Sequence, residues 1–201
     1  IAYTNDTSGN LNQTSVTFSI NTTDTSDAIS PTITIISPSN NTGDSDGNVT
    51  FNYNVTDNSN IANCSLILNN IINQTSILIT KNIVQNFTLN GLGVERFNWS
   101  VNCTDSLNNA GAGETRTLAI VKTTEFSGET TNLLAVNISN ISNLIIDQPS
   151  YGKINFSESV DISSGVDINE HVNISFNRIE INSTALPALN KSARLKLYNL
   201  V

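Results

Sequence analysis

Apolar and polar residues alternate along most of this chain with a period of two. Between Val49 and Val55, for example, Val49, Phe51, Tyr53 and Val55 occupy every second position. Successive side chains of a β-strand point to opposite faces, so this pattern predicts a strand with one buried face. The pattern recurs between turns rich in Asn, Gly, Ser and Asp, and no window holds an apolar stripe of helical spacing. The fold class is therefore predicted to be all-β.

Short strands are predicted throughout the chain. In the middle they cover 31–37, 49–55, 63–68, 76–80, 83–89, 97–103 and 114–121. After residue 125 they cover 133–136, 144–146, 153–156, 160–162, 172–176, 178–181 and 194–200. The inward positions of two middle strands hold Cys64, Leu66 and Leu68, and Phe97, Trp99, Val101 and Cys103. Seven short strands in about 90 residues indicate an immunoglobulin-like or fibronectin-like β-sandwich.

Asparagine is unusually frequent in this chain, with 33 of the 201 residues, and it often takes the polar positions of the alternating strands. Seventeen begin an Asn-x-Ser/Thr triplet without proline at x, which is the acceptor sequence for N-linked glycans in exported proteins. Chance placement would give roughly eight. An AT-rich genome would also enrich Asn, but it would enrich Lys as well, and the chain has only five lysines. The sequence therefore predicts an exported, heavily glycosylated surface protein.

Several acceptor asparagines, among them Asn54, Asn98, Asn155 and Asn173, lie between two apolar residues of a predicted strand. Their side chains are therefore expected to face solvent. The candidate glycosylation sites are Asn5, Asn12, Asn21, Asn40, Asn48, Asn54, Asn63, Asn73, Asn86, Asn98, Asn102, Asn137, Asn140, Asn155, Asn173, Asn182 and Asn190.

Composition narrows the possible partners. The net charge is −8, and the few cations are scattered apart from a small group near the C-terminal end, so no basic stripe exists to follow a nucleic-acid backbone. No apolar run approaches the length of a membrane span. The two cysteines, Cys64 and Cys103, have no second pair for a zinc site and no CxxC spacing. In an exported protein they are expected to form a disulfide.

Five runs of the middle region together resemble the immunoglobulin-like repeats of large archaeal cell-surface proteins: SPTITIISPSNNT, NVTFNYNVTD, IANCSLILNN, FNWSVNCTDSLNNAG and ETRTLAIV. The segments YGKINFSESVDISSGVDI and HVNISFNRIEINSTALPALNKSARLKLYNL are similar to a β module that accompanies such repeats. The resemblance implies a sandwich over 31–124 and a second β domain over 125–201, either cut short or completed by a partner. It carries over no active site. Counted by strands, Cys64 and Cys103 then lie on neighbouring strands of one sheet, unlike the bridge of antibody domains.

The N-terminal 30 residues contain an echo of the sandwich. Thr14 to Ile20, TSVTFSI, lines up with Glu114 to Ile120, ETRTLAI, and the preceding NDTSGN resembles the CTDSLNN turn. The spacing is about 100 residues, the length of one such repeat. Residues 1–30 are therefore expected to hold a strand and a polar linker, as the end of a previous repeat or as a strand donated to a neighbour. The donated apolar residues would be Val16, Phe18 and Ile20.

Candidate catalytic chemistry is sparse. The single histidine, His171, stands beside Glu170 in a predicted strand and is expected to be plain surface. Asp161, Asp167 and Glu170 offer carboxylates, as any acidic β domain does. The loop from Thr42 to Gly47 has the alternating oxygens of a calcium loop, with Asp44 and Asp46, but lacks its first Asp and its bidentate Glu, so a polar turn is expected there. The sequence predicts no enzyme, no metal and no cofactor.

Two functions fit these observations. The first is a structural element of an extracellular assembly (a filament, a sheath or a surface layer), whose copies join head to tail by β-strand addition. The second is an adhesin stalk or a carbohydrate-binding module. Sugar-binding sites offer exposed aromatic platforms, whereas Trp99 and most Phe and Tyr residues take inward positions here. The structural interpretation is therefore favoured.

Overall fold

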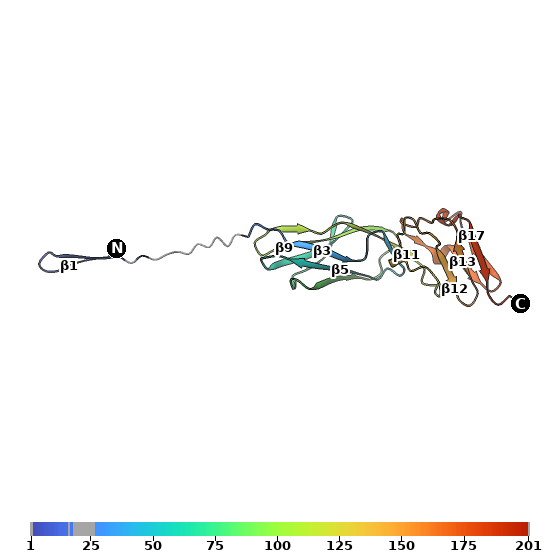
Figure 1. The fold of residues 1–201 in the computed structure, drawn as a ribbon, viewed down its shortest axis with the longest axis horizontal. Coiled ribbons are helices and arrows are strands. Elements are labelled where there is room, and N and C mark those ends of the chain that lie inside the picture. Colours follow the sequence, from blue (N-terminus) through green and yellow to red (C-terminus); the bar gives the residue numbers. More distant parts are fainter. Residues whose placement is uncertain (1, 16, 18–26, 201) are drawn as a thin grey trace.

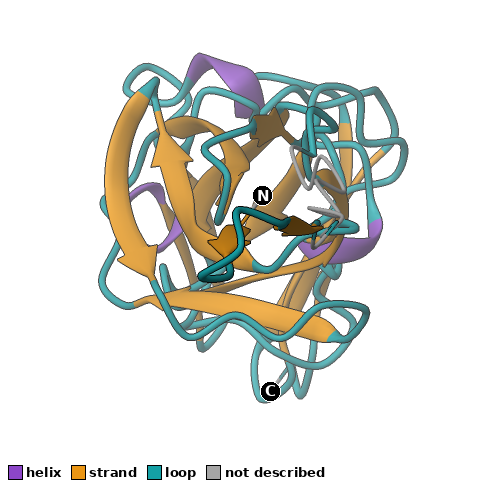
Figure 2. Ribbon diagram, turned by 90° about the vertical axis from the view of Figure 1, so that its left-hand side faces the viewer, coloured by secondary structure: helices purple, strands orange, loops and turns teal. Residues whose placement is uncertain are grey.

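The computed structural model of the chain describes residues 2–15, 17 and 27–200. It has an all-β sandwich fold, in which strands and loops make up nearly all of the described chain and helices are a few short turns (Figure 2). One sheet of the sandwich has the order β3-β5-β8. The facing sheet runs β14-β11-β9-β6-β7, with β10 paired to β9 and β4 paired to β11. The bounds are β3 Thr32–Ser37, β4 Thr42–Asp44, β5 Val49–Thr56, β6 Ile61–Leu68, β7 Ile71–Ser76, β8 Val84–Leu89, β9 Arg96–Asp105, β10 Ala110–Ala112, β11 Arg116–Lys122 and β14 Val166–Asp167.

The alternation predicts the sandwich core correctly. All the inward positions assigned on β5, β6 and β9 are buried, from Phe51, Val55, Leu66 and Val101 at 0% exposed to Leu68 at 7%. Phe51 and Trp99 meet edge to face with ring centroids 4.8 Å apart, and Tyr53 stacks on Phe87 at 5.5 Å. Burial raises the pKa of the Tyr53 hydroxyl to about 12. The Phe51–Trp99 pair joins the two sheets, whereas Tyr53 and Phe87 lie on the neighbouring strands β5 and β8 of one sheet. Both pairs stabilise the sandwich beyond the burial of apolar area.

The strand predicted at Ser76 to Thr80 is wrong, because the chain forms β7 earlier, at Ile71–Ser76. Asn69 and Asn70 both have positive φ, 48° and 65°, and the register pairs Leu68 with Ile71. A two-residue hairpin turn of type I′ needs positive φ at both central residues, and Asn tolerates this conformation better than most. The Asn-Asn turn therefore starts β7 directly after β6 and leaves Ile77 and Leu78 exposed beyond its end.

The chain after β11, residues 123–200, forms a C-terminal module with two further sheets and three short helical turns. A three-stranded antiparallel sheet has the order β12-β13-β17, and β15 forms a hairpin with β16. Leu133–Ala135 is a 3-10 turn and not a strand, because the Asn132 side chain caps it by accepting a hydrogen bond from the Leu134 amide. Val160 forms only an isolated bridge with Ile141, so the strand predicted at 160–162 is also wrong. The bounds are η1 Leu133–Ala135, β12 Ile145–Gln148, β13 Gly152–Phe156, α1 Ile168–His171, β15 Val172–Ser175, β16 Arg178–Ile181, η2 Pro187–Leu189 and β17 Ala193–Leu197.

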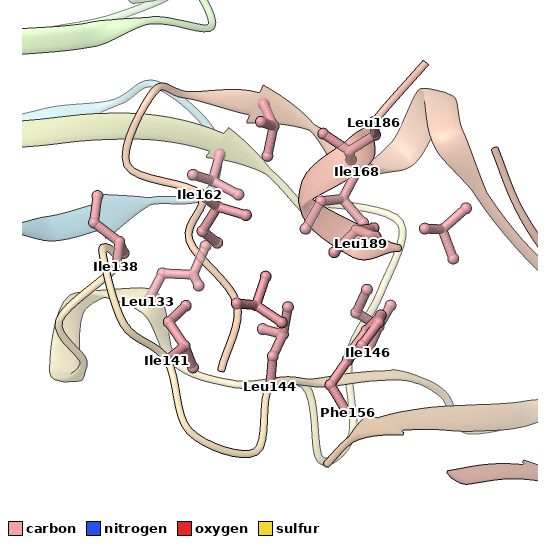
Figure 3. Packing of buried hydrophobic residues seen from close by; sticks show 14 of the residues in the cluster. Leu133, Ile138, Ile141, Leu144, Ile146, Phe156, Ile162, Ile168, Leu186 and Leu189 are labelled. Carbon is pink, nitrogen blue, oxygen red and sulfur yellow. The ribbon is translucent and has the colours of Figure 1, made fainter. Parts of the chain in front are cut away.

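A second hydrophobic core fills this module. It contains Leu133, Ile146, Phe156 and Leu189, all at most 4% exposed. Figure 3 shows that these side chains and their neighbours in the loops point toward one another. Many core residues, such as Ile138 and Ile162, come from loops, so the module depends less on strand alternation than the sandwich does.

Strand β11 belongs to both cores. Leu118 and Ile120 are buried in the sandwich, whereas Ala119 and Val121, on the opposite face of the same strand, are buried in the core of the C-terminal module. β14 pairs in parallel with the end of β11, with Val166 beside Val121. The sandwich and the module consequently lie end to end along the long axis (Figure 1).

The N-terminal segment forms a hairpin of β1 (Ala2–Asn5) and β2 (Leu11–Thr14). These two strands pair with each other and with no other strand of the described residues. The sequence does not predict these two strands, because their apolar and polar residues do not alternate. Of the further strand expected in this segment, Val16, Phe18 and Ile20 lie outside the described residues, as does most of the linker.

Candidate functional site

The acceptor asparagines lie on the surface in the part of the chain that is described. Fifteen of the seventeen have described side chains; twelve of these are exposed, and Asn54, Asn63 and Asn155 are half-buried. The side chains of Asn12 and Asn21 lie outside the described residues. A glycan attached to an exposed asparagine projects into solvent without displacing either core. The twelve exposed positions therefore suit glycosylation sterically. Asn54 and Asn155, which were expected to face solvent, do so only in part, and Oδ1 of Asn54 is buried.

The hydrogen bonds of the asparagine side chains add a chemical distinction. Four acceptor asparagines use only Oδ1: Asn40 accepts from Thr117, Asn48 from Gly91, Asn137 from Ser139 and Asn182 from Ala185. Their Nδ2 atoms, to which an N-linked glycan would be attached, donate no hydrogen bond to a described residue.

By contrast, among the described residues, the asparagines whose Nδ2 donates a hydrogen bond all lie outside acceptor triplets. They are Asn10, Asn52, Asn109 and Asn169. The amide nitrogens of the acceptor triplets are thus left available, while those with a structural role belong to other asparagines.

The disulfide is present between Cys64 and Cys103, with their Cα atoms 4.0 Å apart. The two residues are direct cross-strand neighbours in the pair of β6 and β9. The bond therefore joins adjacent strands of one sheet. Both side chains are buried, at 0% and 1% exposed, under Leu66, Val101 and the rest of the sandwich core.

Three carboxylates converge at the end of the sandwich nearest the N-terminal segment. Asp27, Asp57 and Asp105 each place one carboxylate oxygen within 4.8 Å of the other two. Asp105 is fully buried, and Oδ2 of Asp57 is buried and accepts no hydrogen bond from the described residues. The sequence does not predict this cluster, because 30 and 48 residues separate its members along the chain and no local pattern links the turns that carry Asp57 and Asp105.

Hydrogen bonds and one cation balance this charge in part. Hydrogen bonds from Ile29 and Ser59 lower the pKa of Asp27. Burial opposes ionisation of Asp105, but hydrogen bonds from Asn109 and Leu107 outweigh it and lower the pKa of that carboxyl. Their contribution to stability is thus present above the ordinary aspartate pKa and is lost as the pH falls through the lower folded values. Nζ of Lys81 donates to the carbonyl oxygens of residues 57, 58 and 59, at 3.1, 3.2 and 2.8 Å, so the loop beside the cluster already holds a cation. We assign no metal to it.

Replacing Asp57 by asparagine is expected to raise the melting temperature by about 2–4 °C. The substitution removes one of three facing negative charges, and the new amide can donate to a neighbouring carboxylate in place of the unpartnered oxygen. Oδ1 remains to accept from the Ser59 amide at 2.6 Å. Differential scanning calorimetry with a chelator measures the shift. Glu125→Gln, which removes an exposed charge in the other module, is the control and should change little; a fall for Asp57→Asn would contradict the explanation.

The loop with Asp44 and Asp46 is a turn that follows β4. Oδ1 of Asp44 accepts from the amides of Asp46 and Gly47, at 3.1 and 2.7 Å, and Asp46 accepts from Asn48 at 2.8 Å. Burial raises the pKa of the Asp44 carboxyl against these backbone hydrogen bonds. Both carboxylates serve the turn itself. Thr42 to Asp44, expected to be loop, is the strand β4 that pairs in parallel with β11.

The histidine is placed differently from its prediction. His171 ends the one-turn helix α1, which Asp167 caps at its N-terminus, and is half-buried instead of lying on the polar face of a strand. It lines a hollow of about 660 Å³ together with Glu125, Glu170 and Glu180. The described lining holds no Ser, Thr or Cys, so a nucleophile for a hydrolytic triad is not among those residues.

The other proposed carboxylates are engaged elsewhere. Asp161 accepts from the amide and hydroxyl of Ser163, at 2.9 and 2.7 Å. Asp167 caps α1 and lies 4.0 Å from Nζ of Lys122. Of the suggested set, only Glu170 lines the hollow with His171. Asp167 and Glu170 line a second hollow, of about 460 Å³, together with Lys122, whereas Asp161 lines neither of these two hollows. The three suggested carboxylates are therefore not gathered in one site.

Comparison with known proteins provides no family assignment: no protein-family model matches the chain, and no curated protein matches it significantly. Within the described residues, no helix is long and apolar enough to cross a membrane.

Proposed function

We propose that this chain is a structural segment of an extracellular, glycosylated cell-surface assembly, such as a filament, a sheath or a surface layer, built by end-to-end contacts between β domains. The observation that carries the proposal is the strand β11, which belongs to the cores on both sides of the junction. A flexible tether would let the two units move independently, whereas a shared strand transmits force and orientation directly between them. Such a junction suits a load-bearing element.

Two further sets of contacts strengthen the connection between the sandwich and the C-terminal module at β11. Gly43 of β4 packs so closely on the C-terminal module that an added Cβ would lie 3.1 Å from side-chain atoms of Leu133 and Ile138. The Arg116 guanidinium at the start of β11 donates to the carbonyl oxygens of Ile35, Ile36 and Pro38, at 2.8–3.0 Å. β11 is thereby tied to both sheets of the sandwich and to the next module, as an end-to-end structural element requires.

The proposal includes the N-terminal segment as the contact to the neighbouring unit, which is either a copy of the chain joined head to tail or a different β domain. A two-stranded hairpin is marginally stable by itself in water, so β1 and β2 need a further partner. Catalysis and a cofactor have no part in the proposal, because the functional requirement is a stiff, solvated rod.

A carbohydrate-binding module or adhesin stalk is the alternative. Phe176 and Tyr151 are exposed at 59% and 39% and are the aromatic residues in the described part best placed to meet a sugar. Most other aromatic residues, including Trp99, Tyr53 and Phe51, are buried. The described surface therefore supports sugar binding less well than it supports a structural role.

Native protein is expected to carry many N-linked glycans. The intact mass should exceed the 21.6 kDa of the polypeptide by many sugar units, with Asn54, Asn98, Asn155 and Asn173 among the modified residues. Intact-mass and glycopeptide mass spectrometry before and after enzymatic deglycosylation measure the difference. A native mass equal to that of the bare chain would refute glycosylation.

Electron microscopy of the native surface material tests the structural role. The expected result is an ordered filament or lattice with a repeat set by end-to-end β domains. Labelling with an antibody raised against residues 27–200 should decorate that lattice at its repeat. Dispersed single stalks with sugar-binding activity on a glycan array would favour the alternative and count against the proposal.

A further inference from the structure

The hairpin of β1 and β2 has the same hydrogen bonds in its turn as the hairpin of β9 and β10 in the sandwich. Oδ1 of Asp6 accepts from the amides of Ser8 and Asn10, at 2.8 and 2.9 Å, and its Oδ2 accepts from Nδ2 of Asn10 at 2.9 Å. At the turn between β9 and β10, Oδ1 of Asp105 accepts from the amides of residues 107 and 109, both at 2.8 Å, and Oδ2 accepts from Nδ2 of Asn109 at 2.7 Å. Adding 99 to each number converts one set into the other.

The backbones of the two hairpins agree as well. The amide of Asp6 donates to the carbonyl of Asn10, and that of Asp105 to the carbonyl of Asn109, at 3.1 and 3.0 Å. The turn residue with positive φ is Gly9 at 84° in one hairpin and Asn108 at 69° in the other. The strand registers also correspond: 5 with 11, 4 with 12 and 3 with 13 in the first, and 104 with 110, 103 with 111 and 102 with 112 in the second.

Turns of this kind occur in unrelated hairpins, so the residues that follow them are decisive. In the sandwich, the chain after β10 becomes β11, whose Leu118 and Ile120 are fully buried between the sheets. In the N-terminal segment, the sequence TSVTFSI places Phe18 and Ile20 at the positions of Leu118 and Ile120. Hairpin and closing strand thus recur in the same order, with one residue less between them.

We propose that residues 2–20 are the closing hairpin and last strand of a second β-sandwich of the same kind as residues 31–122. Their partner is a set of strands equivalent to β3 through β8 and the first half of β9, whose open apolar face these residues cover. This inference rests on the proposed function and deepens it by naming the partner of the N-terminal segment. It excludes the sandwich of a second copy as the acceptor, because that sandwich already contains its own β9, β10 and β11.

The differences between the two copies describe the partner further. Ala119 and Val121 of β11 face the C-terminal module, but the corresponding residues are Ser19 and Asn21, both polar. The second sandwich is therefore followed by solvent and a linker, and not by a packed module. Thr4 replaces Cys103, so the bridge has no counterpart there.

A further substitution restricts the partner's first strand. Asn12 stands at the position of Gly111, where an added Cβ would lie 1.9 Å from the carbonyl oxygen of Pro31. The first strand of the partner must therefore begin after the position that corresponds to Pro31. The required strands have the same chemistry whether they come from an N-terminal part of the same polypeptide or from another chain.

A fusion that supplies the missing strands tests the proposal. A second copy of residues 31–100, with its Cys64→Val, is joined directly to Ala2 of the full chain, so that Ala2 follows Ser100 as Val101 does in the sandwich. Asn12→Gly in both the fused and the unfused chain removes the side chain that would meet the Pro31 carbonyl oxygen. The amides of residues 17–20 are expected to gain ~100-fold or more in hydrogen-exchange protection relative to the unfused chain. Phe18→Asp with Ile20→Asp in the fusion should abolish this gain, whereas the matched pair Thr17→Asp with Ser19→Asp, on the opposite face, should preserve most of it.

Unprotected amides at 17–20 in the fusion, or equal effects of the two mutant pairs, would overturn the proposal. Concentration-dependent protection of these amides in the unfused chain would also overturn it, because a second copy would then be the acceptor.

A graft of the turn sequence provides an independent test: Ser106→Thr, Leu107→Ser and Asn108→Gly convert the turn DSLNN to DTSGN in the full chain. Its melting temperature should change by no more than about 4 °C, and a loss of cooperative unfolding would refute the equivalence of the hairpins. These results do not depend on whether native material forms a filament, so failure here is distinct from failure of the proposed function.

Discussion

Replacing both cysteines by valine, Cys64→Val with Cys103→Val, is expected to lower the free energy of unfolding by about 4 kcal/mol. The bridge closes a loop of 39 residues and so restricts the unfolded chain, which is the main source of stabilisation in the chain-entropy model. Valine suits a buried strand position, so the loss should come mainly from the missing bond. Urea unfolding followed by Trp99 fluorescence measures the change in midpoint at constant slope.

Two further measurements isolate the contribution of the bond. The parent protein unfolded in the presence of a reductant should have a midpoint close to that of the double mutant. Without reductant, alkylation of the folded parent should leave both cysteines unlabelled. A difference below about 1 kcal/mol between the oxidised parent and the mutant would show that the bridge contributes little, a result the chain-entropy model does not allow for this loop.

A charge placed on the face of β11 that packs on the C-terminal module should unfold the sandwich as well. Ala119 is 0% exposed and belongs to the core of the module, not to that of the sandwich. Ala119→Asp buries an unpaired carboxylate there, at an expected cost of at least about 3 kcal/mol. Because the same strand carries Leu118 and Ile120 into the other core, displacing it opens both.

The fluorescence of Trp99, the only tryptophan, reports on the sandwich, and hydrogen exchange at Ile146 and Ile154 reports on the module. Both should shift together in Ala119→Asp. Leu195→Asp, at a β17 position that is 55% exposed, is the control and should shift neither by more than about 0.5 kcal/mol. A Trp99 transition that stays at its parent midpoint while the module loses protection would show that the two cores unfold independently.

A strand is predicted correctly where one of its faces packs on a single core, and incorrectly where a turn or a cap sets its position. Strands β5, β6 and β9 face one core with one side, and their alternation marks both the strands and the inward residues correctly. Strand β7 is mispredicted, because its Ile71 and Ile72 are exposed and its position follows from the Asn69-Asn70 turn. The 3-10 turn at Leu133 is apolar like a strand, but the Asn132 cap sets its conformation.

Candidate sites that depend on a local sequence pattern are also predicted, whereas those formed by loops distant in the sequence are not. A triplet around an acceptor asparagine is a local pattern, so all seventeen candidates follow from the sequence alone. The cluster of Asp27, Asp57 and Asp105 depends on three loops meeting, and no local pattern marks it. The sequence predicts a strand at His171, because this polar residue precedes the alternating strand that begins at Val172. In the structure His171 instead ends the one-turn helix α1, whose N-terminus is capped by Asp167.

By itself, the sequence determined the all-β class, the buried faces of the main sandwich strands and the pairing of the only two cysteines. Each of these follows from side-chain periodicity or from a count, which are properties of neighbours along the chain. Only the tertiary structure decided that β11 serves two cores at once, since Leu118 through Val121 form an unbroken apolar run in which no alternation shows. A strand buried on both faces loses its period-two signature, and what covers each face depends on contacts with residues distant in the sequence.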